Sequence, residues 1–366
     1  MKVKPVQLQN GCILTKDVYG LSDSPIIKRN TVLTNNLIEM LHFFLVDFVE
    51  VETVLANGEK FIPIGMKSKR DRKDDNDLAI EHIPKDYHYQ YLEAVKQFKK
   101  LFQNWQAGQL VEMVKVRKIF IHLFEQIINE PKHLLHLHHY TNKEDYLFHH
   151  SVYVGILSVY LGHKLQFSKG DWLQIGFSGV LADIGIAKVS PAILQKPGPL
   201  TSIEFEEVKK HPIHSYKMLK HVTGISDSVL LSVLQHHERL NGSGYPLGTD
   251  ANKLHIFSQI VAVADVYHAM TSERYYRAKK SPYQVLEAIS KEQFGKFDLK
   301  VVQALLESFT QVSVGEIVRL NSGDIAEIVY CDQKNPTRSL VKLLSDQSIV
   351  QLENQNSLYI EELLKK

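Results

Sequence analysis

The sequence has few cysteines, almost no net charge and no long apolar run. Its 366 residues include two cysteines, Cys12 and Cys331, too few for a disulfide framework. With 43 basic and 41 acidic side chains the formal charge is +2, which argues against a general DNA binder. No apolar run approaches the ~18–20 residues of a membrane span, and the N-terminus lacks the apolar core of a signal peptide. These absences predict a cytoplasmic protein that binds neither DNA nor a membrane.

Turn residues, charge runs and apolar periodicity divide the chain into four segments. Residues 1–66 contain turn signals and an apolar/acidic alternation that predict a small β-rich module. Residues 67–84 begin with a nearly continuous charged run, which predicts a linker. Residues 85–310 have a helical pattern, and residues 311–366 return to short strands between turns. The predicted fold class is therefore mainly α, a helical bundle core flanked by small β-rich modules at both ends.

Two carboxylates fall within helices that are apolar nearly all round. Asp183 and Asp265 each follow such a stretch, and a buried carboxylate without a partner is costly, so each requires one. Histidines recur around them at intervals of one helix plus a connection. In chain order the set is His150, Asp183, His211, His236, His237 and Asp265. Imidazole and carboxylate together suit Zn, Mn, Fe or Ni, and six such ligands suit a two-metal site that attacks a phosphodiester.

A second group of histidines lies in a predicted connection between helices. We interpret it as surface histidines rather than as a metal site; its members are His133, His136, His138 and His139. The loop after His237 contains Gly244, Tyr245 and Pro246, which predict a tight, shaped segment at the mouth of the site.

These motifs, in this order, resemble the HD-GYP family, the branch of HD-type metal phosphohydrolases that hydrolyses cyclic di-GMP. The resemblance runs from about residue 145 to residue 309, and the segment from His236 to Pro246 carries the naming signature. It implies an HD-type bundle and a metal-dependent phosphodiesterase that yields pGpG or GMP. It assigns Asp183, His211, His236 and His237 to one metal, and His150, Asp183 and Asp265 to the other, with Asp183 as the central catalytic residue.

The resemblance also assigns substrate contacts. Arg274 and Arg277 would grip phosphate, and the loop of Gly244, Tyr245 and Pro246 would shape the guanine end. A single chain would hold one or two transition-metal ions, and the expected partners are cyclic di-GMP and, in one interpretation, a diguanylate cyclase domain. A long helix over residues 85–129 would lead into the bundle and could support a homodimer.

The sequence departs from the family pattern at the motif that gives the HD name. The usual histidine is Ala182, the usual lysine after the aspartate is Ile186, and an extra glutamate ligand is replaced by Tyr146. His268, three residues after Asp265 on the same helix face, is the first candidate for a replacement ligand, and His149 is the second.

Three functions remain open at this point. The first is an active cyclic di-GMP phosphodiesterase. The second is a degenerate domain that senses cyclic di-GMP or captures a protein partner, which the broken motif favours. The third, a purely structural interaction protein, is disfavoured because most of the expected ligands persist.

Overall fold

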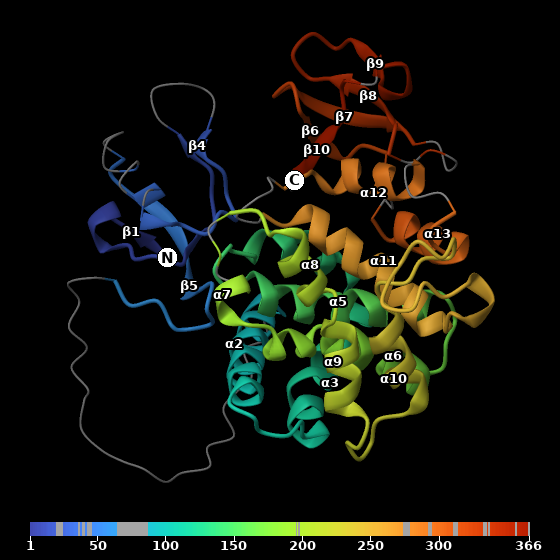
Figure 1. The fold of residues 1–366 in the computed structure, drawn as a ribbon. Coiled ribbons are helices and arrows are strands. Elements are labelled where there is room, and N and C mark those ends of the chain that lie inside the picture. The colour runs from blue at the N-terminus through green and yellow to red at the C-terminus, as the bar shows by residue number, and fades with distance from the viewer. Residues whose placement is uncertain are drawn as a thin grey trace.

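The computed structural model describes most of the chain (Figure 1). The described residues are 1–19, 25–35, 37–38, 41, 46–63, 87–194, 196, 198–273, 279–291, 295–309, 314–331, 335, 337–355 and 357–364. The predicted linker at 67–84 lies outside them, so the four segment boundaries stay a prediction.

A helical bundle forms the centre of the molecule, with one small β module beside it and another above it (Figure 1). Its helices are α2 (Tyr87–Gln106), α3 (Met113–Asn129), α4 (Leu134–Leu137), α5 (Tyr146–Lys164), α6 (Lys169–Leu181), α7 (Pro191–Leu194), α8 (Ser202–Val208), α9 (His211–Leu219), α10 (Asp227–Gln235), α11 (Ile256–Thr271), α12 (Pro282–Lys291) and α13 (Leu299–Phe309). Helices α5, α6 and α11 are buried along most of their length, as their apolar sequences predict. The mainly α fold with β modules at both ends is confirmed.

The single long helix predicted over residues 85–129 is wrong. Helix α2 ends at Gln106, and α3 begins at Met113. Between them Gly108 has a φ of 92°, a left-handed conformation that glycine adopts readily and that ends a helix. The two helices pack against each other and against α5, so their apolar faces belong to the core of this chain.

The N-terminal module is a three-stranded antiparallel sheet with a separate hairpin. The sheet has the order β1 (Lys2–Val3), β5 (Val49–Leu55), β2 (Cys12–Leu14), and the hairpin pairs β3 (Val18–Tyr19) with β4 (Pro25–Ile27). The predicted strand alternation is confirmed in β5, where Val49 and Val51 are buried and Glu50 between them is less so.

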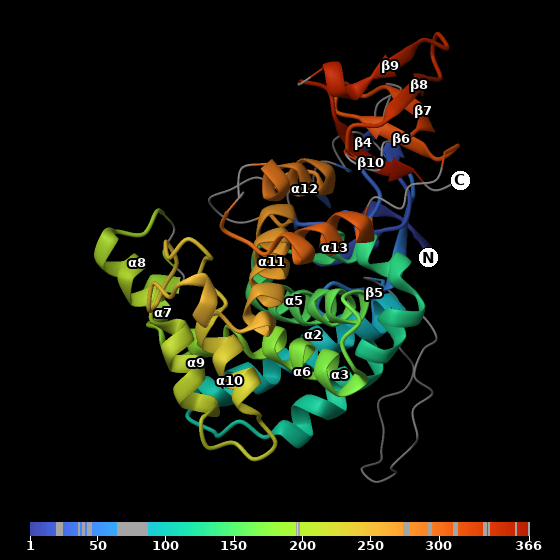
Figure 2. The ribbon, with the colours of Figure 1, turned by 90° about the vertical axis from the view of Figure 1, so that its right-hand side faces the viewer.

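The C-terminal module is a five-stranded antiparallel sheet that rests on α12 (Figure 2). Its order is β10 (Ile360–Leu364), β6 (Ile317–Leu320), β7 (Ile325–Tyr330), β8 (Leu340–Leu343), β9 (Ile349–Gln351). Arg338 joins the module to the bundle, because its guanidinium donates to both carboxylate oxygens of Glu287 on α12, at 2.8 and 2.6 Å. Such a two-point contact fixes orientation as well as distance.

None of the helices in the described part of the chain combines the length and the apolar character that a bilayer crossing requires.

Helices α5 and α6 approach so closely that glycine is required between them. A Cβ added at Gly179 would lie 2.9 Å from both the Cα of Gly155 and the carbonyl oxygen of Val154. Both are backbone atoms, which cannot move aside without separating the helices. This contact holds the helix bearing His150 against the helix that leads into Asp183.

We therefore expect Gly179→Ala to lower the free energy of unfolding by about 1–3 kcal/mol, through overpacking. Urea denaturation measures the change. The control is Gly170→Ala, in the first turn of the same helix, where a new Cβ would come no nearer than 3.8 Å to the Ser168 hydroxyl. Equal stabilities for the two variants would contradict the close-packing argument.

Candidate metal centre

Five helices bring the six predicted ligands to one place. His150 lies in the second turn of α5, and Asp183 lies two residues beyond the end of α6. His211 is the first residue of α9, His236 and His237 directly follow α10, and Asp265 lies within α11. Most of these positions are at helix ends, where a side chain can turn inward without interrupting the helical hydrogen bonds.

Four of these residues form the first cluster. An oxygen, Oδ1, of Asp183 lies 3.1 Å from Nε2 of His211 and 3.5 Å from Nε2 of His236. With His237 included, one ligand atom from each of the four residues lies within 4.8 Å of the others. A carboxylate oxygen and imidazole nitrogens at these distances from one another can bind the same ion.

Three residues form the second cluster, and Asp183 belongs to both. Its other oxygen, Oδ2, lies 3.5 Å from Nε2 of His150. The same His150 nitrogen lies 2.9 Å from Oδ1 of Asp265, whose Oδ2 is 3.7 Å from Nδ1 of His237. The two oxygens of Asp183 thus face different clusters, which is the arrangement of a carboxylate that bridges two ions.

The tautomers of two imidazoles show that the first cluster suits a cation. Nδ1 of His211 donates to the carbonyl of Val208 at 2.8 Å, and Nδ1 of His236 donates to that of Val233 at 2.7 Å. In the neutral ring, Nε2 then carries a lone pair, as a metal ligand must. These two Nε2 atoms lie 3.2 Å apart and both face the Asp183 carboxylate. A cation between these atoms would be bound by both nitrogens and by the carboxylate.

The electrostatics of the carboxylates agree with cation binding. Burial alone would raise the pKa of Asp183, but the close contacts with the imidazoles of His211 and His236 outweigh it and hold that pKa well below its usual range. Burial likewise raises the pKa of Asp265, but the contact with His150 outweighs burial. The net effect is again a lowered pKa. Burial also lowers the pKa of His237 well below its ordinary value, so this ring is neutral at pH 7. The centre therefore presents ionised carboxylates and a neutral imidazole, the protonation states that bind metal.

Two residues that the sequence argument missed hold Asp183 in place. The hydroxyl of Ser215 on α9 donates to the carbonyl of Ala182 and accepts from the backbone N–H of Gly185, each at 2.7 Å. A Cβ at Gly185 would lie 2.1 Å from the carbonyl oxygen of His211, so only glycine permits this approach. Neither residue is a typical metal ligand, so a search of the sequence for metal-binding residues could not have found them.

His268 lies behind His150 rather than among the clustered ligand atoms. Its Nδ1 is 3.0 Å from Nδ1 of His150, which also lies 3.1 Å from the hydroxyl of Tyr146. Nε2 of His268 lies near the hydroxyls of Thr141 and Ser272, at 3.3 and 3.2 Å. His268 and Tyr146 therefore orient the ring whose Nε2 faces the carboxylates. The other candidate, His149, points the opposite way, with its Nδ1 3.0 Å from the hydroxyl of Tyr91.

Neither Ala182 nor Ile186 can itself supply the chemistry of the side chain that is missing from the HD motif. Ala182 is buried with only a methyl group, and Ile186 is buried against the core. The next lysine along the chain, Lys188, donates to the carbonyl of Trp105 at the end of α2, at 3.4 Å. Its ammonium group is thereby directed to the junction with α2.

The Gly-Tyr-Pro loop closes over the first cluster and is fixed by a buried glutamate. The carboxylate of Glu238 accepts from the backbone N–H groups of Leu247 at 2.6 Å and Thr249 at 3.0 Å. A Cβ at Gly244 would lie 2.4 Å from the Cα of Glu238, so the loop turns back directly onto the chain beside the ligands. The ring of Tyr245 stacks on His237 with centroids 4.7 Å apart, and Pro246 follows through a cis peptide bond. Arg274 and Arg277, predicted to grip phosphate, lie outside the described residues.

The prediction that the other histidine group lies at the surface is wrong for one member. His138 is 5% exposed, and His133, His136 and His139 are partly buried. The short helices that connect α3 to α5 fold this segment against α2 and the N-terminal module. Burial, followed by the charges of Lys279 and His136, lowers the pKa of His138 to about 3.

This shift predicts a pH dependence of stability. His138 is neutral in the folded chain, whereas in the unfolded chain it takes up a proton below about pH 6.5. Its contribution is therefore fully present above pH 6.5 and is lost as the pH falls toward 3. We expect His138→Gln to reduce the pH slope of the unfolding free energy by about 1 kcal/mol per pH unit between pH 6 and 4.

Chemical denaturation at a series of pH values measures this slope. The exposed His221 provides the control variant, His221→Gln, which is expected to keep the original slope. A slope in His138→Gln equal to that of the unmodified protein would show that His138 is not held neutral by the fold.

Comparison with known proteins places the bundle in a family. The profile described as "HD domain" matches residues 123–301. The chain is 32% identical over 231 residues to cyclic di-GMP phosphodiesterase PA4108 of Pseudomonas aeruginosa, covering 63% of this chain and 55% of that protein. It is 32% identical over 178 residues to 3'3'-cGAMP-specific phosphodiesterase 1 of Vibrio cholerae, covering 48% and 41%.

A solved HDG"Y"P protein from Bdellovibrio bacteriovorus is similar at 14% identity with a TM-score of 0.48, covering 84% of this chain and 98% of that one. The chain spans about half the length of the curated relatives it matches. Residues 123–301 are an HD domain, and the resemblance of this chain to the HD-GYP family is confirmed.

Proposed function

We propose that this protein is a metal-dependent phosphodiesterase that hydrolyses cyclic di-GMP to pGpG or GMP. The observation that carries the proposal is the position of Asp183, whose two oxygens face two separate ligand clusters. The relatives named as cyclic di-GMP phosphodiesterases supply the substrate class.

Different residues of the chain would bind the metal ions, orient one of the ligands and support the loop over the site. His211, His236 and His237 with Asp183 would hold one divalent ion, and His150, Asp183 and Asp265 a second. Ions of Fe, Mn, Zn or Ni at these positions would lower the pKa of an attacking water and neutralise the phosphodiester charge. His268 and Tyr146 orient His150, and Glu238 holds the Gly-Tyr-Pro loop where a guanine base would lie.

A second candidate function, a binding protein for cyclic di-GMP without turnover, is favoured by one observation. Among the described residues the second cluster has three ligands, and the side chains of Ala182 and Ile186 bring neither an imidazole nor an ammonium group. A weakened second ion would leave the substrate-binding surface in place and remove most of the catalysis. In that role the domain would signal to a partner such as a diguanylate cyclase domain.

Location and assembly are part of the proposal. A chain with only two cysteines, Cys12 and Cys331, suits a reducing cytoplasm, where cyclic di-GMP would be met. The homodimer predicted through the leading helix stays a prediction, and α2 and α3 use much of their apolar surface inside this chain.

The first test is metal binding. We expect His211→Ala to weaken the binding of the ion in the first cluster by about 10–100-fold. The cluster would lose an imidazole whose Nε2 is already oriented by the hydrogen bond of its Nδ1. His214→Ala, three residues later on the same helix, is the control, since His214 belongs to neither cluster. Competition with a chelator, followed by elemental analysis, measures the loss, and equal losses in both variants would contradict the ligand assignment.

The second test is turnover. We expect Asp183→Asn to lower the rate of cyclic di-GMP hydrolysis by more than about 100-fold, because an amide cannot bridge two ions as a charged ligand. Chromatography of the products follows cyclic di-GMP and 3'3'-cGAMP in parallel, with Lys118→Gln on the exposed face of α3 as the control.

Turnover by the unmodified protein that Asp183→Asn abolishes would support the enzyme. Binding of cyclic di-GMP without turnover, with Mn or Fe added, would overturn it in favour of the binding protein. A higher rate with 3'3'-cGAMP would move the substrate assignment to that dinucleotide.

A further inference from the structure

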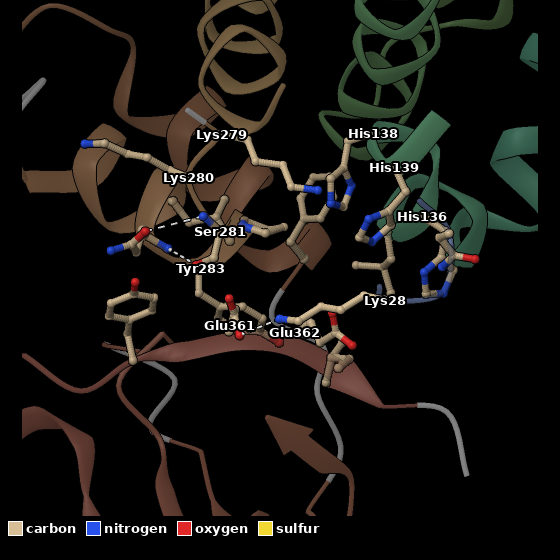
Figure 3. A pocket seen from close by; sticks show the side chains of 18 of the residues that line it. Lys28, His136, His138, His139, Lys279, Lys280, Ser281, Tyr283, Glu361 and Glu362 are labelled. Atoms are coloured by element: carbon tan, nitrogen blue, oxygen red, sulfur yellow. Dashed lines mark hydrogen bonds and ion pairs between the residues drawn. The ribbon is translucent and has the colours of Figure 1, made fainter. Parts of the chain in front are cut away.

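A cavity of about 180 Å³ lies where the two β modules meet the bundle, away from the metal centre (Figure 3). We call it the junction cavity, and all three parts of the fold line it. The N-terminal module supplies Lys28 and Arg29, the segment before α5 supplies His138 and His139, and the C-terminal strand β10 supplies Glu361 and Glu362. Lys279 and the first turn of α12, from Ser281, complete the wall.

One side of the junction cavity is cationic. Figure 3 shows the ammonium group of Lys279 beside the ring of His138, with His139 next to it. The charge comes from Lys279 and Arg29, since burial lowers the pKa values of His138 and His139 and leaves both rings neutral at pH 7. The positive end of α12, which begins at Pro282, lines the same space and also favours an anion.

His138 offers a hydrogen bond that nothing in the described part of the chain satisfies. Its ring is 5% exposed, and its buried Nδ1 has no partner there. An unsatisfied buried polar atom is costly and calls for an explanation such as a ligand.

The carboxylates nearby offset this positive side only in part. Burial lowers the pKa of Lys279, although Glu273, Glu362 and Glu361 all act on it and raise that pKa. Glu361 is in an ion pair with Lys28 at 2.9 Å, which Figure 3 shows on the opposite side of the cavity from His138. Glu273 is paired with Lys143 at 2.9 Å, and Asp145 with Lys99 at 2.7 Å. Several of the acidic groups are thus already neutralised by lysines other than Lys279.

A second cavity of about 390 Å³ adjoins the first, and Asn30, His138, His139 and Lys279 line both. Its other walls are rich in carboxamides and hydroxyls, which suit the polar body of a small molecule. They include Asn10, Thr31, Asn57, Thr141 and Asn142.

We propose that these adjoining cavities bind a small phosphate ester with a polar body, such as a sugar phosphate. The phosphoryl group lies at Lys279, His138 and Arg29, and the hydroxyl-bearing body lies in the second cavity. A phosphoryl group presents three acceptor oxygens, which matches donors that converge from three elements better than a two-oxygen carboxylate does. This inference does not depend on phosphodiesterase activity.

The wall of the site is also connected to the metal centre. The backbone N–H of Lys280 donates to the carbonyl of Met270 in the last turn of α11, at 3.0 Å. The same turn carries His268, which contacts His150. A ligand that orders Lys279 would therefore act on the end of the helix that supports the second cluster.

Calorimetric titration of the full-length, metal-loaded protein with ribose 5-phosphate tests the proposal, with ribose and inorganic phosphate as parallel probes. We expect one ester per chain, no heat from ribose, and weaker binding of inorganic phosphate. Lys279→Gln and Arg29→Gln are each expected to lower the affinity for the ester by about tenfold or more, because each removes a charge-assisted contact with the phosphoryl group. Lys118→Gln, an exposed lysine on α3, is the matched control and is expected to bind as the unmodified protein does.

Asp183→Asn separates this site from the metal centre and is expected to retain ester binding, with at most a small change through the contacts between the two sites. Binding that Asp183→Asn removes and Lys279→Gln retains would overturn the proposal, because the phosphate would then sit at the metal centre. Absence of binding at millimolar ester, or an equal loss in Lys118→Gln, would also overturn it. Equal affinity for inorganic phosphate would overturn the role given to the second cavity.

Discussion

A buried carboxylate surrounded by imidazole lone pairs is the constraint around which the bundle is organised. Asp183 lies between Nε2 atoms of His211, His236 and His150, and two of these rings have their other nitrogen committed to a backbone carbonyl. A cation at the centre of this arrangement would be bound by the carboxylate and the nitrogens together. The close contact of α5 with α6, and the brace from Ser215, place these groups where an ion can satisfy them together.

The two halves of the centre are not equally equipped. Among the described residues, the half built from His211, His236 and His237 has four candidate ligand residues, while the half built on His150 has three. The chain compensates around His150 by orientation rather than by adding a ligand, since Tyr146 and His268 both contact its Nδ1. This asymmetry is the physical basis for weighing a slow enzyme against a binding protein. Both alternatives use the same first cluster and the same Gly-Tyr-Pro loop.

The β modules do more than flank the bundle. The C-terminal sheet is oriented by the contact of Arg338 with Glu287 on α12, and the N-terminal module meets the segment that carries His138. Their meeting point encloses the junction cavity, whose wall continues through Lys280 and Met270 into the last turn of α11. A signal bound there would reach His150 through His268 over a short run of contacts.

The sequence by itself determined the class of fold and the six ligand candidates, because these depend on local periodicity and residue chemistry. The missing histidine was recognised only through the resemblance to the HD-GYP family. The sequence also predicted β5, since an alternation of period two is a local property. It failed where distant segments decide the outcome. The burial of His138, the bracing by Ser215 and the position of His268 behind His150 all depend on contacts between elements far apart in the chain. The break between α2 and α3 does have a local signal, Gly108, which the prediction of a single helix did not use. Only the tertiary structure decided which oxygen of Asp183 faces which cluster, because that depends on how five helices pack and not on any one of them.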